Sequence, residues 1–315
     1  MTKLGPILGL AGATLVAFFL AGAAPAHATF PGANGRIAFV SERYSGTTNI
    51  FTMKPDGSDV TQLTFVTSGQ GGAGQPAWSP DGQSLVFGEV NADFSAFRLY
   101  LMDADGANRE LLFDEEAGLN DFAPSFTPDG TRVVFQRCSP VKETCAIYTV
   151  KIDGHGLVAA DHFTHDVFDI NPKVSPGGDT IAFSSFNRDG VQTAVYLMGP
   201  HGTNIRRITP TALLATDPDW SPDGTKIAFD THCCNPDPKE IWTVNPDGSG
   251  LQQLTTPGTD IDVSPSYSPQ GDKIAFGRSS ADFTIRSIVT MNSDGTGLTT
   301  IQTDAFNPVW GPAAS

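Results

Sequence analysis

Three aspartates occupy one repeated position in this chain and could together do chemistry. Asp121, Asp169 and Asp262 each stand three residues before the proline of a recurring phrase, of which PDWSPDGTKIAF (218–229) is one copy. Carboxylates that converge on one point suit a hard metal ion or a positively charged group of a partner. Aspartate also holds turns that precede a proline, so a purely local role is the alternative. The other three equivalent residues are Ala73, Ala215 and Ala305.

A second polar set stands one residue before the same proline. Amides and carboxylates at one repeated position again indicate either a ligand site or groups that cap turns. A divalent cation is one expectation for such a site, and no other cofactor is expected. The members of the set are Gln75, Asn171, Asp217, Ser264 and Asn307.

Two histidines form the pattern H-x-x-H, which can hold zinc when it lies on a helix. His162 and His165 fall in a segment that aligns with a strand, where their side chains would face opposite sides. Shared zinc ligation is therefore not expected. His165 and His232 could instead both approach the rim that carries the aspartates, with an ordinary surface position as the alternative.

Four cysteines indicate disulfides if the protein is exported. Cys138 ends one expected strand and Cys145 begins the next, so the two could face each other across a hairpin and form a disulfide. Cys233 and Cys234 are adjacent in the sequence. They could form a vicinal disulfide, remain thiols or bind a metal with His232, and the sequence leaves these alternatives open.

Motifs of known enzyme classes are absent from the sequence. There is no G-x-S-x-G nucleophile motif and no phosphate-binding G-x-x-x-x-G-K-[ST] loop. The DADG at 103–106 resembles part of a calcium loop, but the register puts leucines, Leu101 and Leu112, at its first and twelfth ligand positions. We interpret DADG and its relatives as turns.

The recurring phrase defines a repeat that spans the chain. The final phenylalanines of successive copies are separated by 48, 48, 48, 46 and 47 residues, a period typical of propellers and solenoids. Each period contains four short runs rich in Ile, Val, Phe, Tyr and Thr, bounded by turn residues, which predict four strands. The closing phenylalanines are Phe39, Phe87, Phe135, Phe183, Phe229 and Phe276.

The turn and strand chemistry of the phrase predicts stacked sheets. In Ser221-Pro222-Asp223-Gly224, proline fixes φ, aspartate bonds the local backbone and glycine accepts a positive φ, so we expect a hairpin corner. The apolar run Ile227–Phe229 that follows is typical of a strand covered on both faces.

Six such units predict an all-β, six-bladed β-propeller of four-stranded antiparallel blades. The sixth copy is split between the two ends of the chain, in GANGRIAF (32–39) and NPVWGP (307–312). We therefore expect the C-terminal strand to join the N-terminal blade and close the ring. The two polar sets described above would then ring one mouth of the central channel, opposite the rim of the SPDG turns.

These repeats resemble the WD40-like PD40 repeats of the TolB-like β-propeller family. The resemblance covers the chain after its first 28 residues and rests on the near-copies of the twelve-residue phrase. It implies a six-bladed propeller outside the cytoplasm that binds protein partners. Few residues precede the first strand, so we expect this chain to lack the separate α/β domain that precedes the propeller in TolB.

The N-terminal segment predicts export. Residues 1–28 contain one lysine, an apolar run from about Ile7 to Leu20, and the ending Ala26-His27-Ala28, as in a secretory signal peptide. An uncleaved membrane anchor is the alternative, although the run is short for a bilayer. We expect residues 29–315 to form a single secreted, periplasmic or envelope-exterior propeller without a membrane anchor.

The net charge of the chain limits the kinds of partner that it can be expected to bind. The whole chain carries a formal net charge of −15, and removing residues 1–28 leaves 18 basic and 34 acidic residues, a net charge of −16. This charge argues against nucleic acid and anionic membranes as partners. We therefore expect an exported binding module that contacts a protein or another extracellular ligand at the channel mouth. The competing hypothesis is a polysaccharide lyase or hydrolase built from Asp121, Asp169, Asp262 and His165.

Overall fold

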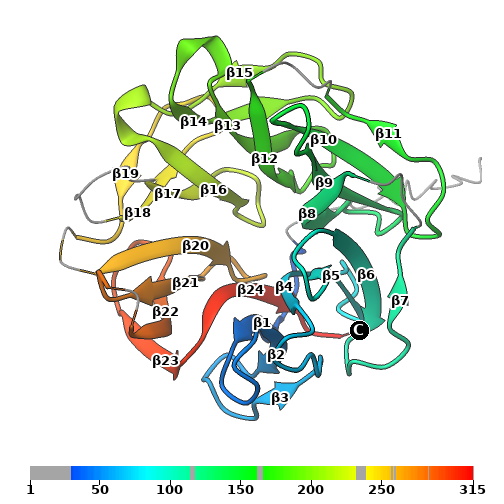
Figure 1. Cartoon of the computed structure of the whole chain (residues 1–315). Coiled ribbons are helices and arrows are strands. Elements are labelled where there is room, and N and C mark those ends of the chain that lie inside the picture. Colours follow the sequence, from blue (N-terminus) through cyan, green and yellow to red (C-terminus); the bar gives the residue numbers. More distant parts are fainter. Residues whose placement is uncertain are drawn as a thin grey trace, which may run out of the picture.

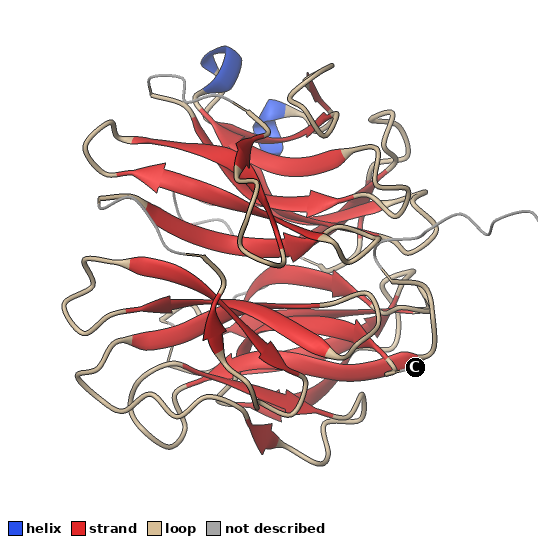
Figure 2. Cartoon of the chain, turned by 90° about the vertical axis from the view of Figure 1, so that its right-hand side faces the viewer, coloured by secondary structure: helices blue, strands red, loops and turns tan. Residues whose placement is uncertain are grey.

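The computed structural model describes residues 30–113, 118–161, 166–231, 239–256, 258, 260–282 and 284–314. In this part of the chain almost all regular structure is β-strand (Figure 2), and six blades stand around a central axis (Figure 1). The predicted signal peptide lies outside the described residues, as do His162, His165, His232, Cys233 and Cys234. No helix in the described ranges is long and apolar enough to cross a membrane.

Each blade has four strands, counted from the axis outward, and one parallel bridge between Cys145 and Phe168 joins blades 3 and 4 into a sheet of eight strands. In blade 1 the innermost strand comes from the C-terminus. Blade 1 consists of β24 (Phe306–Pro312), β1 (Asn34–Ser41), β2 (Asn49–Met53) and β3 (Thr61–Gln62). Blade 2 consists of β4 (Gly72–Trp78), β5 (Ser84–Val90), β6 (Phe97–Asp103) and β7 (Glu110–Leu111). Blade 3 consists of β8 (Asn120–Phe126), β9 (Arg132–Ser139), β10 (Thr144–Lys151) and β11 (Val158–Ala159).

Blades 4 to 6 repeat this order, with two short 3-10 helices in their connections, η1 (Arg188–Gly190) and η2 (Thr211–Leu213). Blade 4 consists of β12 (Phe168–Val174), β13 (Ile181–Phe186), β14 (Thr193–Met198) and β15 (Arg206–Arg207). Blade 5 consists of β16 (Ala215–Trp220), β17 (Ile227–Thr231), β18 (Ile241–Val244) and β19 (Gln252–Gln253). Blade 6 consists of β20 (Ile261–Tyr267), β21 (Lys273–Ser279), β22 (Arg286–Asn292) and β23 (Thr299–Thr303).

The two ends of the described chain close the ring in one blade. Strand β24 pairs antiparallel with β1, with Trp310 opposite Ile37 and Val309 opposite Ala38. Figure 1 shows the C-terminal strand lying beside the N-terminal one at the axis. This confirms the closure that the split sixth repeat predicts.

The core lies between the blades rather than inside any one of them. All six closing phenylalanines are fully buried, and each belongs to a cluster that draws side chains from neighbouring blades. For example, Phe276 packs with Ala228 and Ile241 of the preceding blade. The central run of each second strand is therefore apolar on both faces, as predicted for sheets that stack face on face.

The glycines of the turns form contacts between blades as well as corners within them. Gly224 has φ +70° and lies on Pro176 of the preceding blade, and Gly271, with φ +74°, lies on Pro222. A Cβ at Gly271 would stand 3.0 Å from the proline ring. The proline and glycine of SPDG thus form an inner circle of contacts between the blades, in addition to the corner that the sequence predicts.

Aspartate in the same turn has the structural role expected from the sequence. Asp223 Oδ1 accepts hydrogen bonds from Ser221 Oγ at 2.6 Å and from the Thr225 amide at 3.0 Å. Burial opposes ionisation of Asp223, but these hydrogen bonds outweigh it and lower its pKa below the ordinary value. The carboxylate therefore stabilises the hairpin corner.

Candidate functional site

A cavity of about 230 Å³ lies on the axis and is lined by the innermost strands of all six blades. The residue that precedes the repeat proline faces it in every blade. The six residues are Gln75, Ala123, Asn171, Asp217, Ser264 and Asn307. The second polar set of the sequence therefore does lie together, as the repeat position predicts.

A β-bulge in each innermost strand positions these residues. In blade 5, Thr216 pairs with Asp230 and Asp219 with Ala228, so Asp217 and Pro218 together oppose the single residue Phe229. The same two-to-one count occurs opposite the closing phenylalanine in every blade. Proline fits a bulge because it has no amide hydrogen to donate to the ladder.

The bulges hold the six lining residues at φ between 47° and 53°, in the left-handed region. The amides of Ala123, Asn171, Asp217 and Ser264 donate to side chains of the preceding blade. In three blades the residue after the closing phenylalanine accepts that hydrogen bond. These bonds join Asn171 N to Gln136 Oε1 at 2.9 Å, Asp217 N to Ser184 Oγ at 3.0 Å, and Ser264 N to Asp230 Oδ2 at 2.8 Å.

The side chains form a polar arc over one side of the mouth. Asn171 Nδ2 donates to Asp217 Oδ1, and Ser264 Oγ lies 3.5 Å from Asp217 Oδ2 and 3.4 Å from Asn307 Oδ1. We call Asn171, Asp217, Ser264 and Asn307 the polar arc. Across from it stands Ala123, whose amide donates to Gln75 Oε1 at 3.0 Å, so part of Gln75 is engaged with the wall.

Two charged side chains, Asp217 and Lys173, line the mouth cavity. Asp230 lies behind Asp217, buried, and accepts hydrogen bonds from Thr216 Oγ1 at 2.6 Å and from the Ser264 amide. Burial, and then the charge of Asp217, raise the pKa of Asp230 well above its ordinary value. Of the two carboxyl groups, that of Asp217 lines the cavity, and that of Asp230 is buried behind it.

A smaller cavity of about 40 Å³ continues along the axis. Lys173 and Asp219, one residue beyond the repeat proline, line it from neighbouring blades, and Phe30 lines it from the N-terminal segment. Burial raises the pKa of Asp219 to about 6, although Lys173 opposes the shift. Phe30 also packs against Trp78 and Phe126, so it narrows the channel at the end away from the mouth.

Asp121, Asp169 and Asp262 do not line the mouth cavity, contrary to the expectation that they would. All three are buried inside their own blades and paired with arginine. Asp121 accepts two hydrogen bonds from Arg137, at 2.8 and 3.0 Å, and Asp262 accepts two from Arg278, both at 2.7 Å. The reason is register, because each arginine stands directly opposite its aspartate on the second strand.

Asp169 follows the same pattern with different partners. Ser185 stands opposite Asp169 and donates to its carboxylate, and Arg188 forms an ion pair with both Asp169 and Asp161.

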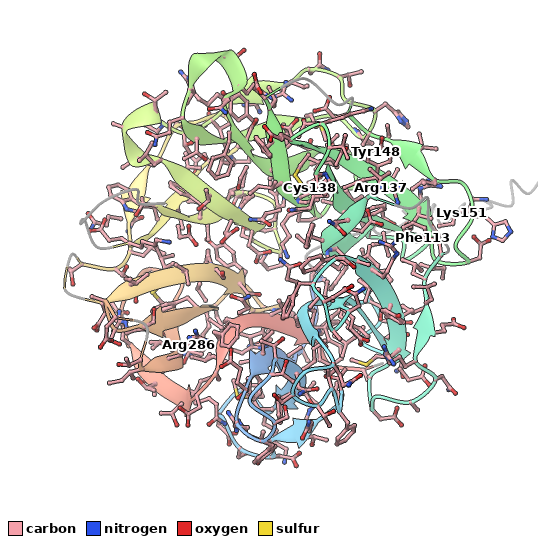
Figure 3. All side chains as sticks on the ribbon, in the orientation of Figure 1. Phe113, Arg137, Cys138, Tyr148, Lys151 and Arg286 are labelled. Carbon is pink, nitrogen blue, oxygen red and sulfur yellow. A yellow bond between two sulfur atoms is a disulfide. The ribbon has the colours of Figure 1, made fainter. Side chains whose placement is uncertain are left out.

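Arg137, the partner of Asp121, is also enclosed by aromatic rings. Its guanidinium lies 5.6 Å from the ring centroid of Phe113 and 5.0 Å from that of Tyr148 (Figure 3). The three aspartates are thus anchored in ion pairs and hydrogen bonds within the blades.

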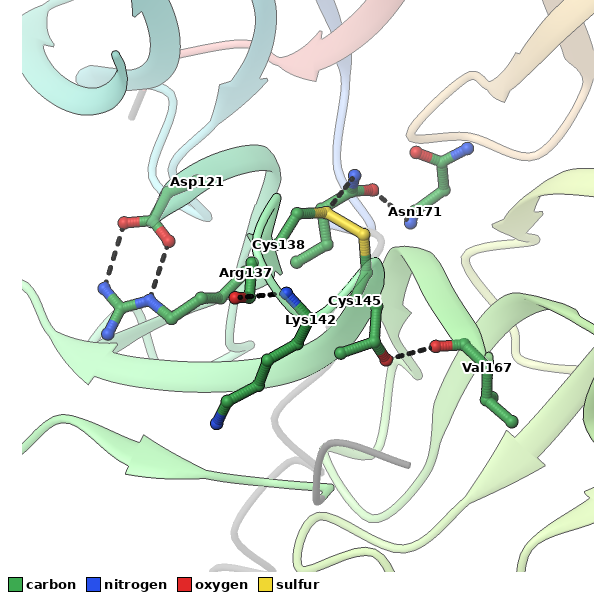
Figure 4. The surroundings of a disulfide bond; sticks show 10 residues. Asp121, Arg137, Cys138, Lys142, Cys145, Val167 and Asn171 are labelled. Carbon is green, nitrogen blue, oxygen red and sulfur yellow. Dashed lines mark hydrogen bonds and ion pairs between the residues drawn. A yellow bond between two sulfur atoms is a disulfide. The ribbon is translucent and has the colours of Figure 1, made fainter. Parts of the chain in front are cut away.

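Cys138 and Cys145 form a disulfide across the β9–β10 hairpin (Figure 4). The hairpin contacts the polar arc through Gln136, which donates from Nε2 toward Cys138 Sγ at 3.7 Å and accepts from the Asn171 amide. Thr144 Oγ1 also donates to the Val167 carbonyl at 2.5 Å. The disulfide therefore braces the hairpin that positions the first strand of blade 4.

Comparison with known proteins shows to which family the chain belongs. The family model of the TolB beta propeller domain, PD40, matches residues 10–161 and 95–315. The chain belongs to this family. A curated relative, an uncharacterized protein of Agrobacterium fabrum, is 30% identical over 162 residues, which are 48% of this chain and 52% of the relative. This TolB-like chain thus aligns with about half the length of the curated relative it matches.

Solved structures share the propeller. The crystal structure of TolB from Acinetobacter baumannii superposes with a TM-score of 0.72 at 22% identity, over 88% of this chain and 67% of that one. An oligogalacturonate lyase in complex with manganese superposes with a TM-score of 0.59 at 16% identity, over 88% and 77% of the two chains. At these identities the likeness concerns the fold.

Proposed function

We propose that this TolB-like propeller is an exported binding module that holds a segment of a protein partner at the channel mouth. The polar arc is the observation that carries the proposal. Four side chains from four blades converge on one cavity and leave hydrogen-bonding groups directed at its interior. Polar groups that converge between prolines of a cavity wall are typical of sites that orient a ligand. Location in the cell envelope is part of the proposal, supported by the likeness to TolB.

The chemistry of the arc favours a ligand group that donates hydrogen bonds or carries positive charge. The carboxyl group of Asp217 lines the cavity, and Asn171 and Asn307 add amide oxygens. A cavity of about 230 Å³ accommodates one or two side chains rather than a folded domain. The partner would therefore insert a short segment. Lys173 lines both this cavity and the smaller one beyond it, so a cationic group of the partner would bind on the side of the mouth formed by Asp217, away from Lys173.

A divalent cation at the mouth is a narrower form of the same proposal. Asp217, Asn171 and Asn307 would supply oxygen atoms, which are the ligands of hard cations. A bound cation would in turn polarise a ligand carbonyl or carboxylate at the mouth. Within the described ranges, no three His, Cys, Asp or Glu side chains form a group able to hold a metal ion. Elemental analysis of the purified protein, compared with an Asp217→Asn variant, tests this form.

The experiment for the binding role compares capture by wild-type protein with capture by a blocked mouth. Ser264→Phe places a ring over the polar arc, and Thr225→Ala, on the opposite rim, is the matched control. We expect a partner from native envelope and medium to be retained by wild type and by Thr225→Ala and lost with Ser264→Phe. Retention by all three proteins would contradict a role for the mouth.

A propeller enzyme is the second candidate, and the likeness to an oligogalacturonate lyase favours it. It would use the carboxylate of Asp217 as a base at the mouth. Oligogalacturonate and manganese are the first substrate and metal to test, with formation of the unsaturated product followed by absorbance. Turnover by wild type that is lost in Asp217→Asn, at equal folded fraction, would favour the enzyme over the binding module.

A further inference from the structure

An exposed phenylalanine occupies a position where the fold favours glycine. Phe94 is the seventh residue after the closing phenylalanine of blade 2, in the hairpin between β5 and β6. Blades 1 and 4 have Gly46 and Gly190 at the same position, with φ +65° and +69°. Phe94 adopts φ +57°, and its side chain is 65% exposed. A bulky residue in the left-handed region is strained by on the order of 1 kcal/mol or more.

The hairpin holds Phe94 in this position without using its ring. Asp93 Oδ1 accepts from the Ser95 amide at 3.1 Å, Asn91 Oδ1 accepts from the Ala96 amide at 3.0 Å, and the Phe94 amide donates to the Asn91 carbonyl. These bonds fix the backbone and direct the ring outward. The strain and the exposure are both unfavourable to the isolated fold, which indicates that the ring serves a contact outside it.

Two further aromatic side chains stand on adjoining loops. Tyr44, between β1 and β2, is 73% exposed, and Phe65, between blades 1 and 2, is 75% exposed. The loops are tied together, because Thr47 Oγ1 donates to the Gly71 carbonyl and a Cβ at Gly71 would meet the carbonyl oxygen of Val90. We call Tyr44, Phe65 and Phe94 the aromatic rim patch. Its loops lie on the same rim as the channel mouth, since they connect second to third strands or successive blades.

The charges around the patch favour a basic partner. Glu42, Arg43 and Asp93 are the charged residues of 41–49, 65–71 and 91–96. Glu42 forms an ion pair with Arg286 of blade 6 at 3.3 Å, so Asp93, next to Phe94, is the acidic group of these loops for which the described residues supply no cationic partner. Arg43 lies 5.3 Å from the ring centroids of Phe39 and Phe51 and bonds Ser41, so its cation is engaged within the blade. The chain as a whole is strongly acidic, which attracts cations and repels anionic membranes. Exposed aromatic faces bind guanidinium and ammonium groups.

We propose that the aromatic rim patch binds a basic polypeptide segment, with Phe94 as the anchor residue. Arginine or lysine side chains of the partner lie over the faces of Tyr44, Phe65 and Phe94, and their aliphatic stems cover the ring edges. The acidic character of the chain steers the segment to the rim. This contact is separate from the mouth cavity and does not depend on the polar arc.

The test selects peptides from a random dodecapeptide library on the immobilised mature protein and measures the affinity of the enriched peptides by fluorescence polarisation. We expect enrichment in arginine or lysine. Phe94→Gly should weaken binding by about tenfold or more, as for an interface anchor. Because glycine relieves the backbone strain at Phe94, the variant should unfold at a urea concentration no lower than that of wild type. Leu298→Ser, at an exposed apolar site on the opposite rim, is the control and should bind as wild type does.

Specified results would overturn the proposal. These are enrichment without basic residues, no enrichment at all, or equal binding by Phe94→Gly and wild type. Sedimentation with phosphatidylcholine vesicles, or a dimer in gel filtration, that is lost in Phe94→Gly would assign the patch to lipid or to self-association instead. Asp217→Asn measured in parallel separates the two sites, because it should leave this peptide affinity unchanged even if the mouth has no ligand.

Discussion

Buried carboxyl groups beside the channel make individual residues sensitive to pH. Asp219 is buried at the channel wall, and its pKa of about 6 exceeds the ordinary value of 3.8. Since the folded state binds this proton more tightly than the unfolded state, the stabilisation is complete below about pH 4 and is lost as the pH rises through 6. Asp219 therefore contributes stability in mild acid that is absent at neutral pH.

We predict that Asp219→Asn removes this pH dependence. Between pH 4 and pH 7 the free energy of unfolding of wild type should fall, relative to the variant, by on the order of 2–3 kcal/mol. Urea unfolding at pH 4, 5, 6 and 7 measures the difference. Asp223→Asn is the control, because the pKa of Asp223 is lowered and its contribution is lost only below pH 4. Parallel curves for wild type and Asp219→Asn would contradict the assignment.

The positive-φ glycines allow the strain argued for Phe94 to be measured directly. A Cβ added at Gly190 would meet no atom within 4 Å, so a substitution there changes the backbone energy alone. We predict that Gly190→Ala lowers the free energy of unfolding by about 1 kcal/mol. Chemical denaturation measures it, and an unchanged midpoint would remove the argument that Phe94 is held at a cost.

At the scale of the element, each first strand combines a feature that the sequence predicts with one that it does not. The strands, the SPDG corners and the mouth position of Asn171 and Asp217 follow from the repeat and from turn chemistry. The bulge opposite the closing phenylalanine does not, because it depends on pairing register between strands. This register also decides that Asp121 and Asp262 face arginines rather than the axis. The sequence did contain one indication of these ion pairs, because Arg137 and Arg278 each follow a closing phenylalanine by two residues.

The disulfide hairpin provides a prediction at the same scale. Its contacts with Val167 join β10 to the start of β12, and Gln136 holds the Asn171 amide. We predict that replacing both Cys138 and Cys145 by serine leaves the fold intact but speeds hydrogen exchange of amides 167–171 by about tenfold or more, because local opening costs less free energy.

Hydrogen exchange followed by mass spectrometry measures this effect peptide by peptide. Peptides from blade 1, on the other side of the ring, are the internal reference and should exchange as in wild type. Thr144→Val, which removes one contact with Val167 and keeps the disulfide, should give a smaller change in the same peptide. Uniform acceleration over all blades would indicate general destabilisation rather than a local brace.

At the scale of the molecule, closure by the C-terminal strand makes six marginal sheets into one cooperative unit. No blade covers both of its faces alone, and the clusters that contain the closing phenylalanines draw on neighbouring blades. Strand β24 completes blade 1 and also reaches blade 2, where the Trp78 indole donates to the Val309 carbonyl at 3.2 Å. Losing it would expose the apolar faces on both sides of one seam.

We predict that ending the chain at Asp304 opens blade 1 and converts one sharp thermal transition into a broader transition at lower temperature. The buried triplet Ile37–Phe39 would lose its partner strand, and a newly unpaired strand edge would promote aggregation. Within the strand, Trp310→Ala should cost about 3–5 kcal/mol through the cavity it leaves. Trp310→Phe should cost much less, because the Trp310 Nε1 hydrogen has no partner among the described residues. Calorimetry and near-ultraviolet circular dichroism follow the transitions, and a truncated protein that melts as wild type does would show that the ring needs no closure by β24.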